Sequence, residues 1–133
     1  MIVVIDTNIF VSGIFWSGTP YELLKLWVAN KFQVVFTPET LNECFRVLKE
    51  IGKDKDPTLA EEWILFISKN SQLVDKVSNL VLCRDKDDDK FINCAISGKA
   101  DFIISGDKDL TDLKEVNGVQ IIKPKQFYDM IKK

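Results

Sequence analysis

The chain has 133 residues, of which 46% are hydrophobic and 29% charged, a balance typical of a globular domain rather than a disordered chain. Its formal net charge is −2, so it lacks the overall positive charge that many nucleic-acid-binding proteins carry. It contains no histidine, which excludes Ser-His-Asp and Cys-His catalysis as well as histidine-based metal sites. Acid–base or metal chemistry in this chain must therefore rely on carboxylates.

Cysteine usage and hydropathy predict a cytoplasmic protein. Cys44, Cys83 and Cys94 are far apart and odd in number, which favours buried free thiols in a reducing compartment. No apolar run approaches the roughly 20 residues that a membrane-spanning helix needs. The first residues do not resemble a secretory signal, because no basic region precedes the apolar run and Asp6 interrupts it. We expect one domain, residues 1–133, with no membrane partner.

The first ten residues combine an apolar run with a polar end. Residues 2–5 have the length and composition of a strand that is buried on both faces, as in a parallel sheet. Asp6 follows directly, at the carboxyl end of that strand, where open α/β sheets bind their ligands. Asp6, Thr7 and Asn8 are also ordinary turn residues. Taken alone, this stretch is either part of a site or a polar turn.

The remaining elements alternate between helix and strand. Residues 11–18 are expected to form a loop because Gly13, Gly18 and Pro20 punctuate them. A second loop is expected at residues 52–57. Helices are predicted at 19–30, from 37 to the second loop, at 58–70, from 88 or 89 to 97, and from 124. Strands are predicted at 33–36, 102–104 and 119–122, with a less regular extended piece at 73–77 and a short helical turn at 108–113.

This alternation predicts an α/β fold. Strands that alternate with helices favour a central parallel sheet with right-handed crossovers and helices on both faces. Four to five strands are expected in that sheet. The carboxyl ends of parallel strands share one edge with the first turns of the helices that follow them.

Acidic residues are predicted to converge on that edge. Asp6 and Asp107 each follow a strand, and Asp88 and Asp89 stand at the start of a helix. Glu43, two turns inside the helix that begins after residue 37, is a fourth candidate. Several carboxylates in one cleft repel each other unless a cation neutralises them. Oxygen ligands favour Mg²⁺ or Mn²⁺ over zinc, and such an ion can activate water against a phosphodiester.

Four segments together resemble the PIN-domain family, and in particular its bacterial and archaeal members described as toxin components of toxin–antitoxin pairs. The segments are VIDTN at 4–8, TPE at 37–39 leading to Glu43, DxxDDxF at 85–91, and ADFIISGDxDL at 100–110. The resemblance implies a PIN-like, flavodoxin-like three-layer α/β/α sandwich and a metal-dependent ribonuclease. It also implies an antitoxin partner and a homodimer.

The resemblance also implies roles for individual residues. Asp6 would be the first metal ligand, Glu43 the helix-borne carboxylate and Asp107 the last acid. The third acid would be Asp88 or Asp89, of which one would cap the helix and the other bind metal, with Asp89 the preferred ligand. The supporting groups would be Asn8, which orients the first ligand or the water, and the hydroxyls of Ser105 and Thr7.

Other interpretations fit parts of the pattern. A phosphatase of the haloacid-dehalogenase type would use Asp6 as a nucleophile and residues 106–112 for Mg²⁺, but it needs a second Asp at position 8, which is Asn8 here. A non-catalytic binding module would retain the cleft without activity. The four acids could also be unrelated caps and turns, which explains Asp6 and a helix cap but not Glu43.

The expected substrate is single-stranded or looped RNA. Bound metal would reverse the local charge, and scattered lysines could flank the cleft, namely Lys86, Lys90, Lys108 and Lys123. Phe15 and Trp16 could stack on an unpaired base, although such residues more often pack against a neighbouring helix or subunit.

Overall fold

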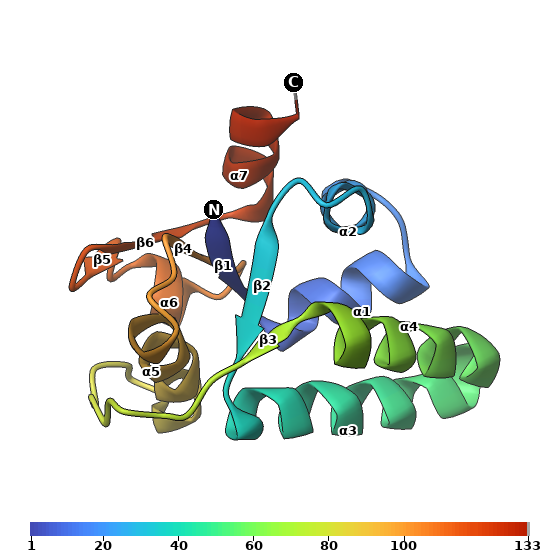
Figure 1. The fold of residues 1–133 in the computed structure, drawn as a ribbon, viewed down its shortest axis with the longest axis horizontal. Helices are drawn as coiled ribbons and strands as arrows, with labels where there is room; N and C mark the ends of the chain where they lie inside the picture. Colours follow the sequence, from blue (N-terminus) through green and yellow to red (C-terminus); the bar gives the residue numbers. More distant parts are fainter. Residues whose placement is uncertain (133) are drawn as a thin grey trace.

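A computed structural model describes residues 1–132, and within them a single mixed sheet forms the centre of the molecule (Figure 1). Its strand order is β3-β2-β1-β4-β6-β5, and only the β5–β6 pair is antiparallel. The strands are β1 (Ile2–Ile5), β2 (Gln33–Phe36), β3 (Gln72–Leu73), β4 (Phe102–Ile104), β5 (Glu115–Val116) and β6 (Val119–Ile122). The predicted α/β fold with a mostly parallel sheet is confirmed.

The sheet has one strand more than the four to five expected, because β5 was not predicted. This two-residue strand forms a hairpin with β6 through Asn117 and Gly118, both of which have positive φ angles of 50° and 85°. Asn-Gly is the preferred pair for the tight turn that joins two antiparallel strands. The expected extended piece at 73–77 is also shorter, since β3 ends at Leu73.

Helices cover both faces of the sheet. They are α1 (Thr7–Phe15), α2 (Thr19–Val28), α3 (Pro38–Lys55), α4 (Pro57–Asn70), α5 (Asp89–Ser97), α6 (Lys108–Thr111) and α7 (Pro124–Ile131), with a 3₁₀ turn, η1 (Lys86–Asp88), before α5. Alternate residues of β1 separate the two layers: Val3 and Ile5 pack with α1 to α4 and α7, whereas Val4 packs with α5 and α6. None of the described helices is long and apolar enough to cross a membrane.

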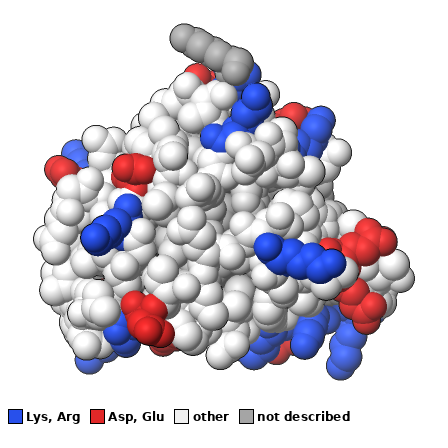
Figure 2. All heavy atoms as spheres, in the orientation of Figure 1, with Lys and Arg blue, Asp and Glu red and all other residues white. Residues whose placement is uncertain are grey.

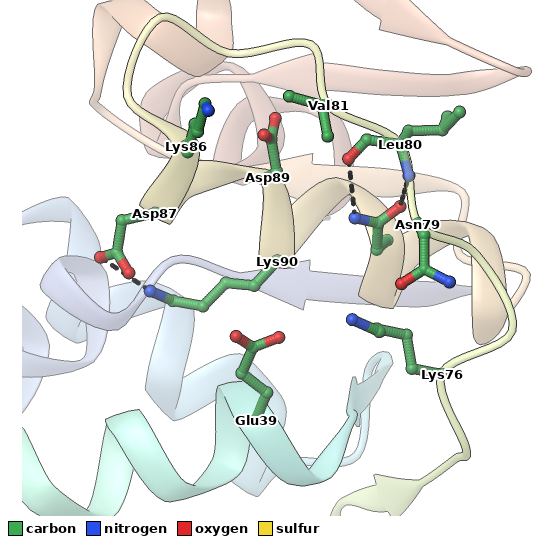
Figure 3. Close-up of a pocket in the computed structure, with 10 residues that line it drawn as sticks. Glu39, Lys76, Asn79, Leu80, Val81, Lys86, Asp87, Asp89 and Lys90 are labelled. Carbon is green, nitrogen blue, oxygen red and sulfur yellow. Dashed lines mark hydrogen bonds and ion pairs between the residues drawn. The ribbon is translucent and has the colours of Figure 1, made fainter.

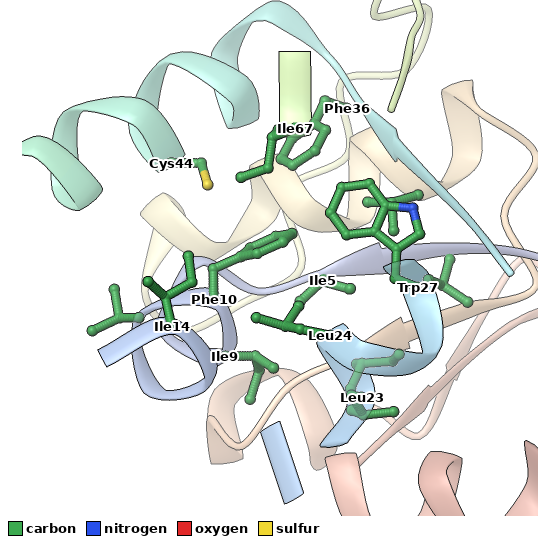
Figure 4. Close-up of a cluster of buried hydrophobic side chains, with 14 of the residues drawn as sticks. Ile5, Ile9, Phe10, Ile14, Leu23, Leu24, Trp27, Phe36, Cys44 and Ile67 are labelled. Atoms are coloured by element: carbon green, nitrogen blue, oxygen red, sulfur yellow. The ribbon is translucent and has the colours of Figure 1, made fainter. Parts of the chain in front are cut away.

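The loop expected at residues 11–18 is wrong, because α1 continues to Phe15. Its buried side chains include Phe10, which stacks on Phe36 with ring centroids 5.8 Å apart and meets Trp27 edge-on at 6.1 Å (Figure 4). A Cβ added at Gly13 would lie 2.6 Å from Cδ1 of Leu24. Gly13 therefore permits the close approach of α1 and α2, and does not break the helix.

The prediction of a loop at residues 52–57 is also wrong, because helices occupy most of this stretch. Helix α3 reaches Lys55 and α4 begins at Pro57, so only Asp56 separates them. A Cβ at Gly52 would lie 2.5 Å from Cβ of Ala60, which shows that this glycine lets the two helices pack tightly. Asp56 accepts a hydrogen bond from the backbone N–H of Leu59 and caps α4.

Candidate metal centre

Asp6 forms the turn after β1 and also lines a pocket with other acids, so it fits both interpretations of its sequence context. It follows β1 and caps α1, because its Oδ1 accepts a hydrogen bond of 3.3 Å from the backbone N–H of Asn8. Its Oδ2 accepts a bond of 2.6 Å from the Ser105 hydroxyl. The residue is only 4% exposed, and burial raises its pKa, although the hydrogen bonds from Ser105 and Asn8 oppose this.

The Ser105 hydroxyl links Asp6 to Asp107. It donates to the Asp6 carboxylate and accepts a bond of 3.0 Å from the backbone N–H of Asp107. Asp107 stands at the end of β4 and caps α6 by accepting a bond of 2.9 Å from the N–H of Asp109. Ser105 is fully buried, and its two hydrogen bonds hold the carboxylate of Asp6 in a fixed position relative to the backbone of Asp107.

Asp88 contributes the third carboxylate, from the last residue of η1. It occupies the cap position of α5, yet its side chain makes no capping hydrogen bond. Its Oδ2 is buried without a hydrogen-bond partner among the described residues. Burial, followed by the neighbouring charge of Asp107, raises the pKa of Asp88 from 3.8 to about 7. Oxygens of Asp88, Asp107 and Asp109 lie within 4.8 Å of one another, which is close enough to share one cation, but Asp109 already pairs with the guanidinium of Arg84 at 2.7 Å.

Glu43 reaches the same pocket from α3, but it already has a cationic partner. Its Oε2 accepts a bond of 2.5 Å from the Thr7 hydroxyl, and its Oε1 lies 2.6 Å from Nζ of Lys90. The Lys90 side chain is 6% exposed and also lies 2.8 Å from the Asp87 carboxylate. Burial alone would lower the pKa of Lys90, but the bonds to Asp87 and Glu43 outweigh it and raise the pKa. Lys90 thus neutralises Glu43 and is not free to contact a phosphate.

The carboxylates of Asp6, Glu43, Asp88 and Asp107 share one pocket of about 240 Å³. Its lining residues are Asp6, Thr7, Asn8, Glu43, Val47, Asp85, Asp87, Asp88, Phe91 and Asp107. We call it the acidic pocket. Predicted site residues from β1, α1, α3, β4 and the start of α5 therefore meet as expected from the shared edge of the sheet. The sequence did not indicate that exposed Asp85 and Asp87 belong to this lining, nor that Lys90 pairs with Glu43.

Asp89, unlike the other predicted acids, does not line the acidic pocket. Its Oδ1 accepts hydrogen bonds of 2.9 Å and 2.8 Å from the backbone N–H groups of Leu82 and Cys83. Burial would raise its pKa, but these donors outweigh that effect and lower it. Asp89 lines a neighbouring pocket, where its carboxylate points toward the segment that carries Val81 (Figure 3). The geometry therefore favours Asp88 over Asp89 as a ligand, contrary to the expectation from the sequence.

The aromatic residues considered for base stacking lie away from the acidic pocket, at the far end of α1. Phe15 packs close to Gly52, while Trp16 is 52% exposed and lies beneath Nζ of Lys55, which is 4.5 Å from its ring centroid. Neither residue lines the acidic pocket. The geometry thus gives no support to a base-stacking role for them.

The family follows from a comparison of the sequence. A family model for the PIN domain matches residues 2–109. The chain belongs to the PIN-domain family. A protein of Methanocaldococcus jannaschii, named as uncharacterized protein MJ1680, is 36% identical to it over 98% of this chain and 92% of that protein.

A solved structure shows the same fold. The crystal structure of VapBC2 from Rickettsia felis, bound to a DNA fragment from its promoter, contains a chain that matches this PIN domain with a TM-score of 0.60. The match covers 92% of this chain and 98% of that chain, at 16% sequence identity. At this identity the likeness concerns the fold alone, and it confirms the PIN-like architecture.

The residues of the acidic pocket suit a hard divalent cation. Its candidate ligands are carboxylate oxygens, and Asp88 offers a buried oxygen that no protein group satisfies. A thiolate ligand from Cys83 is disfavoured, because burial and the neighbouring Asp89 raise the pKa of Cys83 to about 12. This PIN domain therefore has the donor set of a Mg²⁺ or Mn²⁺ site rather than of a zinc site.

Proposed function

We propose that this PIN domain is a Mg²⁺- or Mn²⁺-dependent endoribonuclease. The observation that carries the proposal is the unpartnered, buried Oδ2 of Asp88, beside Asp107 in a pocket whose other acids are already held in place. An unpaired carboxylate oxygen in such a site costs stability unless a cation binds it. Membership of the PIN family supports the nuclease chemistry.

The chain's own residues would share the work as follows. Asp6, Asp88 and Asp107 would hold the metal, which when bound activates water and stabilises negative charge on a phosphodiester. The Ser105 hydroxyl fixes Asp6 relative to Asp107. Asn8 is exposed and lines the pocket, and in this proposal it would orient the substrate or the water.

Glu43 has a positioning role in this proposal. The Thr7 hydroxyl and the Lys90 ammonium hold its two oxygens, so its carboxylate faces the pocket in a fixed orientation. With its charge balanced by Lys90, Glu43 is better placed to accept a hydrogen bond from water than to add a full negative charge to a metal site.

The residue at position 8 does not favour the phosphatase alternative, because Asn8 cannot serve as the general acid that such enzymes require. A non-catalytic role would leave metal binding intact without cleavage, so the two remaining functions differ in a direct assay.

The test is a cleavage assay on defined single-stranded RNA, with end-group mapping of the products. The wild-type protein should cleave with Mg²⁺ or Mn²⁺ and lose activity in EDTA. Asp107→Asn should lose at least about a hundredfold, since it removes a metal ligand. Asp75→Asn is the matched control, because Asp75 is exposed and lies outside the acidic pocket. Equal activity of wild type and Asp107→Asn, or activity in EDTA, would refute the mechanism.

A toxin role and its partners extend this proposal. We propose a cognate antitoxin as partner, supported by the fold shared with a VapBC2 chain, and a homodimer. Induced expression should then arrest growth, whereas expression of Asp107→Asn should not. Sedimentation equilibrium of the purified protein tests the dimer. We place the activity in the cytoplasm because Cys44, Cys83 and Cys94 are free thiols, which a reducing compartment preserves.

A further inference from the structure

A second pocket, of about 480 Å³, lies between α6, β6 and the start of α7. It is lined by Lys108, Thr111, Asp112, Lys114, Gln120, Ile121, Ile122, Lys123 and Gln126. We call it the lysine pocket. Its three lysines are all exposed, and they come from three different segments of the chain that only the fold brings together.

The lysine pocket carries uncompensated positive charge. None of its three lysines forms an ion pair with a carboxylate of residues 1–132. The only acid in the lining, Asp112, lies 3.7 Å from the guanidinium of Arg84. On the face drawn in Figure 2, Lys and Arg are interspersed with Asp and Glu. In a chain of net charge −2, the local excess of cations in the lysine pocket creates a potential that attracts an anion.

The neutral groups of the lining also suit a phosphate-rich ligand. Thr111, Gln120 and Gln126 add a hydroxyl and two amides that can bind phosphate or sugar oxygens. The Gln126 side chain accepts a hydrogen bond from the N–H of Lys123, which fixes the start of α7 against the pocket. Several donors spread over a large, open and polar pocket suit an extended polyanion better than one small ion.

The lysine pocket adjoins the acidic pocket at the same edge of the sheet. Lys108 directly follows Asp107, so one short turn contributes to both pockets. On the other side, the carbonyl of Ile122 accepts a hydrogen bond from the N–H of Ser105, the residue that links Asp6 and Asp107. Lys123 is the next residue. The two pockets therefore meet at residues 107 and 108.

We propose that the lysine pocket binds the phosphate backbone of single-stranded RNA, on one side of the phosphodiester that enters the acidic pocket. This inference rests on the proposed ribonuclease function for the identity of its ligand. It answers a specific problem of that function, because carboxylates around the reaction centre repel RNA. A flanking group of unpaired lysines supplies the attraction that the acidic pocket lacks.

The test is equilibrium binding of a labelled, short single-stranded RNA in EDTA, measured by fluorescence anisotropy at several salt concentrations. The site variant carries Lys108→Gln, Lys114→Gln and Lys123→Gln. We expect it to bind roughly 10- to 100-fold more weakly, and the dependence of log K on log salt to flatten by about 2, as expected for three lost contacts to a single strand.

Two further variants make the result specific. The charge-matched control carries Lys31→Gln, Lys69→Gln and Lys99→Gln, three exposed lysines that precede β2, β3 and β4 at the opposite edge of the sheet. It should bind nearly as wild type, and arginines at 108, 114 and 123 should preserve affinity. Wild-type affinity of the site variant, or equal losses in site and control variants, would overturn the proposal. Because EDTA prevents metal-dependent cleavage, failure of the nuclease function would appear only in the cleavage assay.

Discussion

Replacing Asp88 with asparagine should stabilise the metal-free protein. The carboxylate is buried, its Oδ2 has no partner among residues 1–132, and its pKa is raised from 3.8 to about 7. The folded protein thus binds this proton more tightly than the unfolded chain does. The favourable contribution is fully present below about pH 4, and it is lost as the pH rises toward 7. Above pH 7 the ionised Asp88 opposes folding, and Asp88→Asn removes that charge.

The size of the stabilisation by Asp88→Asn follows from how far the pKa of Asp88 is raised. About three pKa units at roughly 1.4 kcal/mol each set an upper limit of about 4 kcal/mol at pH 8. The net gain should be smaller, about 1–2 kcal/mol, since the open pocket admits water that screens the charge. In a domain of this length, that gain corresponds to a rise in Tm of roughly 3–6 °C.

Thermal melts in EDTA and in Mg²⁺, at pH 5 and pH 8, test both the pH dependence of the stabilisation and its dependence on metal. Asp88→Asn should melt above wild type in EDTA at pH 8, with a smaller gap at pH 5. Saturating Mg²⁺ should raise the wild-type Tm, since a ligand at 100 times its Kd adds about 2.7 kcal/mol, and should raise that of the variant much less. A lower Tm for the variant in EDTA at pH 8, or equal Mg²⁺ responses, would refute the reasoning.

The neighbouring residue provides the matched control. Asp89→Asn has the same chemistry one position away, but the Asp89 carboxylate accepts two backbone hydrogen bonds and its pKa is lowered. We expect this substitution to destabilise the protein by about 1–3 kcal/mol while the Mg²⁺ response is retained. Opposite changes in the free energy of unfolding for Asp88→Asn and Asp89→Asn would distinguish a metal ligand from an acid with a structural role.

Other substitutions test the surroundings of the site. Lys90→Met should lower the unfolding free energy by about 2–4 kcal/mol in urea titrations, because Glu43 loses its cationic partner; an unchanged midpoint would contradict the buried pair. Asn93→Ala should accelerate hydrogen exchange at the Leu80 amide that its side chain holds, and unchanged protection there would show that the contact is unimportant. Gly13→Ala should cost about 1–3 kcal/mol, whereas Gly106→Ala, with open space around it, should cost much less; similar costs would argue against tight packing of α1 on α2.

The sheet was predictable because its strands are short apolar runs with clear boundaries. The predicted limits of β1, β2, β4 and β6 agree with the structure. The two errors in the helical layer share a feature, since each expected loop, at 11–18 and at 52–57, contains a glycine that lies inside a helix in the structure. Each of these glycines allows two helices to approach so closely that a Cβ would clash. Such contacts depend on residues from another helix, and local sequence does not reveal them.

The candidate site was predictable in outline but not in detail. The position of Asp6 and Asp107 follows from the shared carboxyl edge of parallel strands. Spacing could not decide between Asp88 and Asp89, because the deciding partners are the N–H groups of residues 82 and 83. That segment has no periodic pattern that would predict its path. The Lys90–Glu43 pair is equally hidden, since it joins α5 to α3 across the fold.

The division of charge around the acidic pocket explains why a cation would be held at one point. Lys90 balances Glu43, and backbone N–H groups satisfy Asp89, so the protein itself compensates those two acids. Asp6 and Asp107 receive only neutral donors, and one oxygen of Asp88 receives none. The uncompensated charge is therefore concentrated at Asp88 and Asp107, with Asp6 in the same pocket. A fold that leaves this charge unbalanced loses stability, and under the proposed function a bound divalent cation would restore that stability.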